Sequence, residues 1–155
     1  MIEIPDLPSL GMAALCAITF LLALASGLVP FVINTELYLL GVATLTSASP
    51  VLMVALATTG QMLGKWVVYG VGRGSLNIKW VRRVGASKVV RTFAGRPATT
   101  TSILALSAVT GIPPFYGVSF LAGVVRMPAP LFLMIGTVGR VVRFSAVFMT
   151  PELFR

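Results

Sequence analysis

Three long apolar runs constrain the fold of this chain more than any other feature. One run, from Leu10 to Val29, contains twenty residues without a charge, and the others cover residues 51–71 and 131–149. A helix of about 20 residues crosses the hydrocarbon core of a bilayer, which is about 30 Å thick. Only 10% of the residues are charged, whereas a soluble domain carries roughly a quarter. We therefore predict one integral membrane domain over residues 1–155.

The scarce polar residues limit the chemistry that this domain can perform. The chain has no histidine, one cysteine and four acidic residues, which excludes a histidine-based triad and argues against a metal site. Residues 70–74 are rich in glycine, but their spacing differs from the dinucleotide-binding fingerprint and no βαβ pattern surrounds them. We therefore expect no enzyme, no metal and no cofactor.

One carboxylate, Glu36, lies inside an apolar region, six residues after Pro30. An ionised carboxylate in hydrocarbon is costly, so Glu36 should face protein, water or a partner charge. Proline breaks a helix, and a membrane tolerates the freed backbone groups only where protein or water satisfies them. A broken helix beside a buried acid marks the binding site in several transporter folds. Pro30 and Glu36 therefore predict a polar site within the membrane.

A second break interrupts the uncharged residues 99–125 at Pro113 and Pro114. Each half has about a dozen residues, too few to span a bilayer, so a re-entrant hairpin is the simplest solution. The segment 26–31 (SGLVPF) recurs in altered form at 110–115 (TGIPPF). This recurrence predicts two halves, each a proline-tipped hairpin followed by one long helix.

The two predicted halves define the expected fold. Repeat one covers about residues 10–72, a basic linker covers 73–96, and repeat two covers about 97–149. One spanning helix and the linker separate the hairpins, so they should open to opposite sides of the membrane. The prediction is an all-α, polytopic helical membrane protein with two proline-tipped re-entrant hairpins in an inverted repeat.

Small and basic residues within the two long helices suggest further roles. Gly60 and Gly64 lie on one helical face and predict close helix packing, and Lys65 is near enough to Arg73 to snorkel toward the interface. Two arginines in the apolar run 131–149 are candidate counter-charges for Glu36. Alternatively, both arginines snorkel to lipid headgroups. These arginines, three residues apart on one face, are Arg140 and Arg143.

The linker holds seven basic residues and no acid. By the positive-inside rule, this composition places it in the cytoplasm. Its pattern predicts an amphipathic segment on an anionic leaflet, and a role as topology determinant only is an equal alternative. Nucleic acid is not an expected partner, because both flanks are membrane segments. The predicted headgroup surface consists of Lys79, Arg82 and Arg83.

Three groups of residues resemble the motifs of the DedA family, also called the SNARE-associated or VTT-domain family. The first is Pro30…Asn34-Thr35-Glu36…Leu40-Gly41, and the second is Gly60-x-x-x-Gly64-x-x-x-x-Tyr69-x-x-Gly72-Arg73. The third, similar to the branch of small DedA-like proteins, is Pro113-Pro114…Ala122-Gly123…Arg126-Met127-Pro128…Phe132…Gly136…Arg140. The resemblance covers about residues 25–145.

This resemblance implies re-entrant hairpins, a bacterial inner-membrane location, and movement of phospholipids or polyprenyl-phosphate carriers across the bilayer. Proton-coupled members carry a second acid about two turns after the glutamate, where this chain has residues 41–43 (GVA). Members also often carry arginine after the second proline, where this chain has Phe115 and Tyr116. Both departures argue against proton coupling.

Two functions remain open at this stage. The preferred one is a lipid translocator with a path formed by Glu36, Arg140, Arg143 and the prolines of the two tips. The alternative is a non-transporting structural or partner-binding subunit, in which the charges only lock the hairpins together. Membrane phospholipids or polyprenyl phosphate are the expected partners, and a homo-oligomer is compatible with either function.

Overall fold

The computed structural model describes residues 7–29, 34–74 and 96–153, and every regular element in these ranges is an α-helix. Within them, α1, α3 and α8 contain stretches that are long and apolar enough to cross a membrane. The predicted all-helical architecture is therefore confirmed for this part of the chain. The helices are α1 (Leu7–Leu28), α2 (Thr35–Leu45), α3 (Pro50–Gly72), α6 (Pro97–Thr110), α7 (Phe115–Val124) and α8 (Ala129–Leu153).

Polar, proline and glycine residues set where these helices begin and end. α2 begins after Asn34, whose side-chain oxygen accepts a hydrogen bond from the backbone N–H of Glu36 (3.0 Å). Pro50 is the first residue of α3, where its missing N–H leaves no helical bond unmade. α6 ends at Gly111, whose φ of 79° lies in the left-handed region that glycine adopts without strain. Two prolines then separate α6 from α7.

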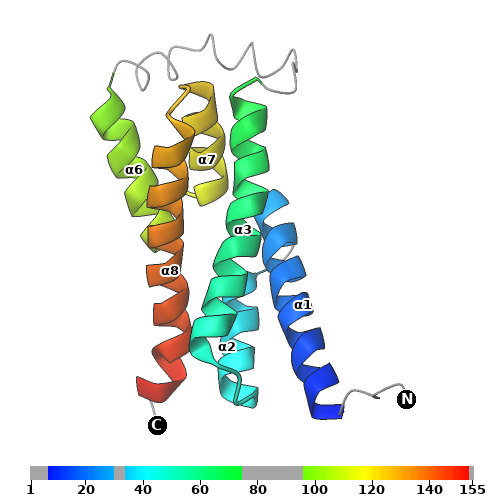
Figure 1. Ribbon diagram of the computed structural model, residues 1–155. Coiled ribbons are helices and arrows are strands. Elements are labelled where there is room, and N and C mark those ends of the chain that lie inside the picture. The colour runs from blue at the N-terminus through cyan, green and yellow to red at the C-terminus, as the bar shows by residue number, and fades with distance from the viewer. Residues whose placement is uncertain (1–6, 30–33, 75–95, 154–155) are drawn as a thin grey trace.

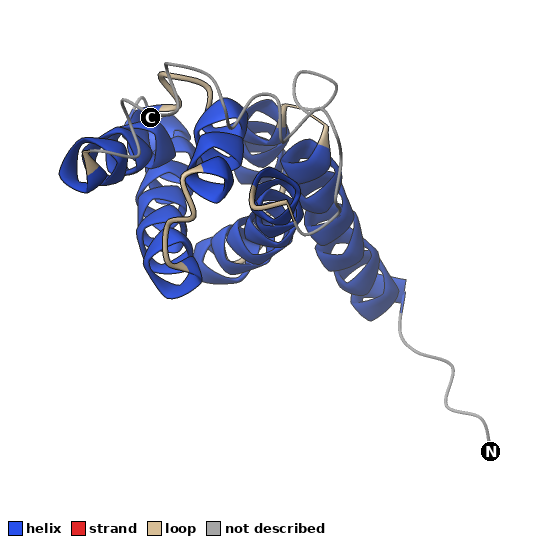
Figure 2. Ribbon diagram, turned by 90° about the horizontal axis from the view of Figure 1, so that it is seen from above, coloured by secondary structure: helices blue, strands red, loops and turns tan. Residues whose placement is uncertain are grey.

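The helices form two hairpins that enter the bundle from opposite ends (Figure 1). α1 rises from one end and α2 returns to it, while α6 and α7 do the same from the other end. The ends of the arms meet near mid-height, and α3 and α8 run along the bundle beside them. With 22 residues in α1 and 11 in α2, the first hairpin is lopsided, and α1 splays outward when viewed along the bundle (Figure 2).

Each short second arm packs on the long helix of the other half. α2 lies against α8, and α7 lies against α3, while α1 packs mainly on α3 and α6 on α8. The α1–α3 crossing is close because glycines line it: a Cβ on Gly64 would come within 2.7 Å of the Cα of Gly27, and one on Gly60 within 2.5 Å of the Phe20 carbonyl oxygen. Gly60 and Gly64 thus face α1 within the same chain.

The buried apolar side chains form two clusters with a polar layer between them. α3 leaves the first cluster at Ala57 and enters the second at Met62. The buried Gln61 lies between these positions, and the buried Lys65 follows one turn later. α8 passes through the same clusters in the opposite direction, with the buried Arg140 between its contributions. The polar layer therefore lies at the level where the hairpins meet.

Candidate functional site

A cavity of about 380 Å³ lies between the two hairpins. The ends of both hairpins contribute to its walls, and so do both long helices. Charged and hydroxyl side chains therefore gather at the middle of an otherwise apolar bundle. The lining residues are Ser26, Asn34, Thr35, Glu36, Gln61, Lys65, Gly111, Pro114, Phe115, Tyr116, Arg140 and Arg143.

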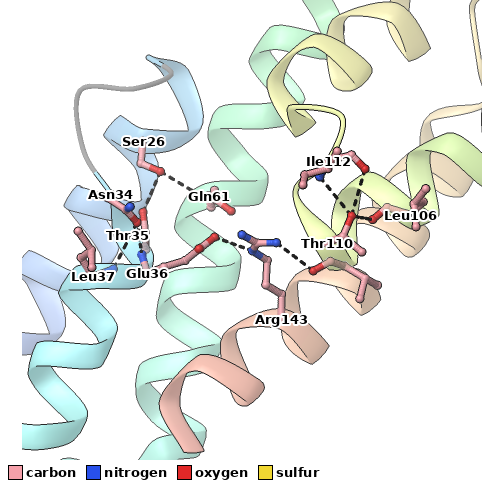
Figure 3. Close-up of polar contacts among 11 residues, drawn as sticks. Ser26, Asn34, Thr35, Glu36, Leu37, Gln61, Leu106, Thr110, Ile112 and Arg143 are labelled. Carbon is pink, nitrogen blue, oxygen red and sulfur yellow. Dashed lines mark hydrogen bonds and ion pairs between the residues drawn. The ribbon is translucent and has the colours of Figure 1, made fainter. Parts of the chain in front are cut away.

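An ion pair between Glu36 and Arg143 crosses this cavity (Figure 3). The Nε of Arg143 donates to Glu36 Oε1 over 2.5 Å, and its Nη1 donates to the carbonyl oxygen of Val109 over 3.1 Å. The side chain of Arg143 is 20% exposed, and that of Glu36 is 32% exposed. Arg143, on α8, thereby connects the first turn of α2 to the last turn of α6. The counter-charge of Glu36 is thus Arg143, the second of the two candidates.

Arg140 lies in the same cavity, one helical turn earlier on α8, but forms no salt bridge with a carboxylate among the described residues. The residue is only 5% exposed, and its Nε has no hydrogen-bond partner. Its guanidinium lies over the ring of Phe115, with 4.4 Å between the guanidinium carbon and the ring centroid. Snorkelling to headgroups, the alternative for this residue, does not fit a side chain that is buried inside the bundle.

Lys65 also points into the bundle, which corrects the expectation that it snorkels toward the interface. It is 3% exposed, and its Nζ donates to the carbonyl oxygen of Gly27 over 3.0 Å. The ammonium also lies 4.9 Å from the ring centroid of Tyr116. Lys65 therefore contacts the end of α1 and the start of α7 inside the bundle.

Uncharged polar groups hold the first hairpin end against α3. The Ser26 hydroxyl oxygen accepts hydrogen bonds from Thr35 Oγ1 (2.8 Å) and from Gln61 Nε2 (3.0 Å), and Figure 3 shows these groups side by side. The Oε1 of Gln61 has no hydrogen-bond partner in the described structure. Asn34 caps α2 by accepting from the N–H groups of Glu36 and Leu37. The N-terminus of α2 is therefore already satisfied.

The second hairpin end is held by hydroxyl groups and shaped by its prolines. Ser107 donates to the carbonyl oxygen of Pro113 over 2.6 Å, and Thr110 accepts from the Ile112 N–H over 3.1 Å. Pro114 precedes the first residue of α7, and its side chain cannot cap the helix. Consequently, the N-terminus of α7 opens onto the cavity without the side-chain cap that α2 has.

The sequence-predicted site residues fall into three groups. Glu36, Arg140, Arg143 and Pro114 line the cavity, and Pro113 lies in the same turn. Gly60 and Gly64 lie at the α1–α3 contact. The other predicted residues lie outside the described part of the chain: Pro30, Lys79, Arg82 and Arg83.

Sequence reasoning missed Lys65, Gln61 and Ser26 as site residues. A usable signal was present, because Gln61 and Lys65 are four residues apart on one face of an otherwise apolar helix. Polar and ionisable residues inside a membrane helix usually face a cavity or the bundle interior. With Lys65 included, three cations and one carboxylate line the cavity, which leaves a surplus of two positive charges when all four are ionised.

Together these features define, over the described residues, an all-helical bundle with three candidate membrane spans and a charged cavity. Scans against protein-family models, curated proteins and solved structures gave no match to this chain. The DedA resemblance therefore stays a prediction from the sequence motifs.

Proposed function

We propose that this chain is a membrane lipid translocator, which moves phospholipid or polyprenyl-phosphate headgroups across the bilayer through the cavity between its hairpins. In this proposal α1, α3 and α8 cross the membrane, and the hairpins are re-entrant from opposite sides, as halves of an inverted repeat. The membrane is the bacterial inner membrane, with residues 73–96 on the cytoplasmic side, as the basic composition and the DedA resemblance imply.

The observation that carries this proposal is the charged cavity at the middle of an apolar bundle. A charged side chain at the bilayer centre costs at least about 2.5–3.5 kcal/mol. A bundle with a purely structural role would gain stability from well-packed apolar residues at such positions. Four charged side chains around one cavity therefore favour a function that handles charge, such as passage of a headgroup.

The surroundings of the cavity suit a lipid whose chains stay in the bilayer. Glu36 and Arg143 are partly exposed, so the ion pair is accessible from outside the bundle. Large apolar side chains such as Leu21, Val51 and Val138 are exposed on the outer helix faces, as expected for surfaces that contact lipid. The headgroup can then cross beside the charges while its acyl chains remain among these apolar surfaces.

The ion pair supplies a reversible binding step. The planar guanidinium of Arg143 can bind two phosphate oxygens at once, so a phosphate group competes with Glu36 for the same donors. When the ion pair between Glu36 and Arg143 forms again, the headgroup is released. Binding that is favourable but readily reversed is what passage through a membrane protein requires.

The alternative of a partner-binding subunit receives less support. In that alternative Gly60, Gly64 and the basic linker bind a partner protein or lipid, but α1 of the same chain covers both glycines. A small-residue surface that is already occupied offers no contact site for a second protein.

A fluorescence assay in proteoliposomes tests the proposal. Purified protein is reconstituted with NBD-labelled phospholipid, and dithionite is added to quench the label in the outer leaflet. We expect wild type to expose inner-leaflet lipid to dithionite, and Glu36→Gln and Arg140→Gln to lose this activity. The matched control is Arg126→Gln, which removes an exposed cation that does not line the cavity and should retain the wild-type rate.

Two results would contradict the proposal. If wild type leaves inner-leaflet lipid protected for several headgroups and for a polyprenyl-phosphate analogue, the chain is not a translocator. If the Glu36 and Arg140 variants insert, fold and translocate as wild type does, the path does not run through this cavity.

A further inference from the structure

The charge surplus of the cavity is concentrated at its α7 side. Arg143 is already paired with Glu36, which is the only acid among the residues whose side chains the structure describes. Lys65 and Arg140 carry the remaining positive charges, and both are more than nine-tenths buried. Two buried like charges that form no salt bridge are costly unless a ligand neutralises them.

The start of α7 lies between these two cations. Arg140, from α8, covers the ring of Phe115, while Lys65, from α3, lies over the ring of Tyr116. Each cation therefore contacts one of the first two residues of the ten-residue α7. No side chain caps the first N–H groups of this helix, and the N-terminus of a helix favours an anion.

Both cations also have hydrogen-bond donors that no described residue uses. The Nε of Arg140 has no hydrogen-bond partner among the described residues. Lys65 donates to the Gly27 carbonyl, and an ammonium has three donors, so two remain for a ligand. By contrast, α2 offers no comparable site, because Asn34 occupies its N–H groups. The donors that remain belong to two side chains that contact the start of α7.

We propose that Lys65, Arg140 and the N-terminus of α7 form a subsite for a phosphate group that carries two negative charges, as in a phosphomonoester. This inference rests on the proposed function and names the class of headgroup that the cavity prefers. A zwitterionic headgroup leaves the surplus of two charges unchanged, and a phosphodiester anion neutralises one. A phosphomonoester dianion neutralises both, and its three terminal oxygens can accept from all three groups of donors.

Ligand binding to the detergent-solubilised full chain tests this subsite. Short-chain phosphatidic acid and phosphatidylmethanol differ by one methyl group, yet at pH 8 the first carries nearly two charges and the second carries one, because the second pKa of a phosphomonoester is about 6. Affinities follow from the rise in unfolding temperature with ligand concentration. We expect phosphatidic acid to bind wild type about tenfold more tightly or better.

Substitutions test whether Lys65 causes the preference for phosphatidic acid over phosphatidylmethanol. Lys65→Met should abolish the preference for phosphatidic acid, Lys65→Arg should retain most of it, and the exposed control Arg126→Met should leave it unchanged. Equal affinities of wild type for the two lipids would overturn the proposal, as would an unchanged preference in Lys65→Met. The wild-type comparison decides even if Lys65→Met does not fold.

Two further arms identify the source of the phosphate and separate this inference from the proposed function. If inorganic phosphate binds as tightly as phosphatidic acid, the subsite is supported and its ligand is a soluble phosphate. If inorganic phosphate binds more weakly, the subsite is supported and its ligand is a lipid. Translocation without a preference for the dianion would overturn the subsite and keep the translocator. Dianion-selective binding without translocation would keep the subsite and overturn the translocator.

Discussion

At the scale of single residues, the Glu36–Arg143 pair is the central contact of the site. It joins two segments that are 107 residues apart in the sequence, and Arg143 also binds the end of α6. Because both side chains are only partly buried, the pair should contribute less than a fully buried one. Its effect is nevertheless measurable, because removal of either partner leaves a charge beside an apolar interior.

We predict that Glu36→Gln and Arg143→Gln each lower the free energy of unfolding by about 1–3 kcal/mol, since each leaves the other charge unpaired. The double variant should lose less than the sum of the two, with a coupling of about 1 kcal/mol. Denaturant or thermal unfolding in detergent micelles measures these values, with the exposed Arg126→Gln as control. Strictly additive losses would show that the pair contributes no interaction energy.

The sequence predicted some of these residues and not others, for physical reasons. Glu36, Arg140 and Arg143 could be found because an isolated charge within an apolar run has few allowed environments. The sequence could not choose between the two arginines, because residues three apart share one helix face. Lys65 was assigned to the interface because only its distance along α3 is visible in the sequence. Its burial depends on the hairpin ends that pack over it.

At the scale of elements, glycines and prolines determine how the helices meet and where they break. The apolar runs 10–29, 51–71 and 131–149 predicted α1, α3 and α8 to within a few residues. The prolines at 113 and 114 predicted the break between α6 and α7. Which long helix each short arm would contact was beyond prediction, because contacts between segments far apart in the chain leave no local pattern.

We predict that Gly64→Ala destabilises the α1–α3 crossing by about 1–3 kcal/mol, because its Cβ would lie 2.7 Å from backbone atoms of α1. Gly41→Ala is the matched control, since a Cβ there meets nothing within 4 Å. That change should be neutral or stabilise α2 by up to about 1 kcal/mol. Unfolding temperatures in one detergent compare the variants. Equal temperatures would mean that α1 does not pack as closely as described.

At the scale of the whole molecule, the connections between elements divide between two ends. The α2–α3 connection lies at the end where both α1 begins and α8 finishes, and the α7–α8 connection lies at the opposite end (Figure 1). If α3 crosses a bilayer, these two connections face different compartments. The proposed orientation places the α7–α8 connection in the cytoplasm, on the side of the basic linker.

We predict that cysteines placed at Ser47 and Arg126, in a Cys16→Ala background, react with a membrane-impermeant maleimide from opposite sides. Both positions are exposed. In inverted inner-membrane vesicles Arg126→Cys should be labelled and Ser47→Cys protected, with the reverse in right-side-out vesicles. Labelling of both positions from one side would refute this topology, and exchanged sides would mean that the basic linker is not cytoplasmic.

The crossed packing of the two halves also has a consequence for biosynthesis. A chain is made from its N-terminus, so α2 and its carboxylate leave the ribosome long before α8 supplies the matching guanidinium. Until then α2 lacks α8, the helix against which it mainly packs, whereas α7 is made after both α3 and α6, its main neighbours. The first half therefore reaches its final packing only after α8 is inserted, and α7 completes its packing on a helix of the first half.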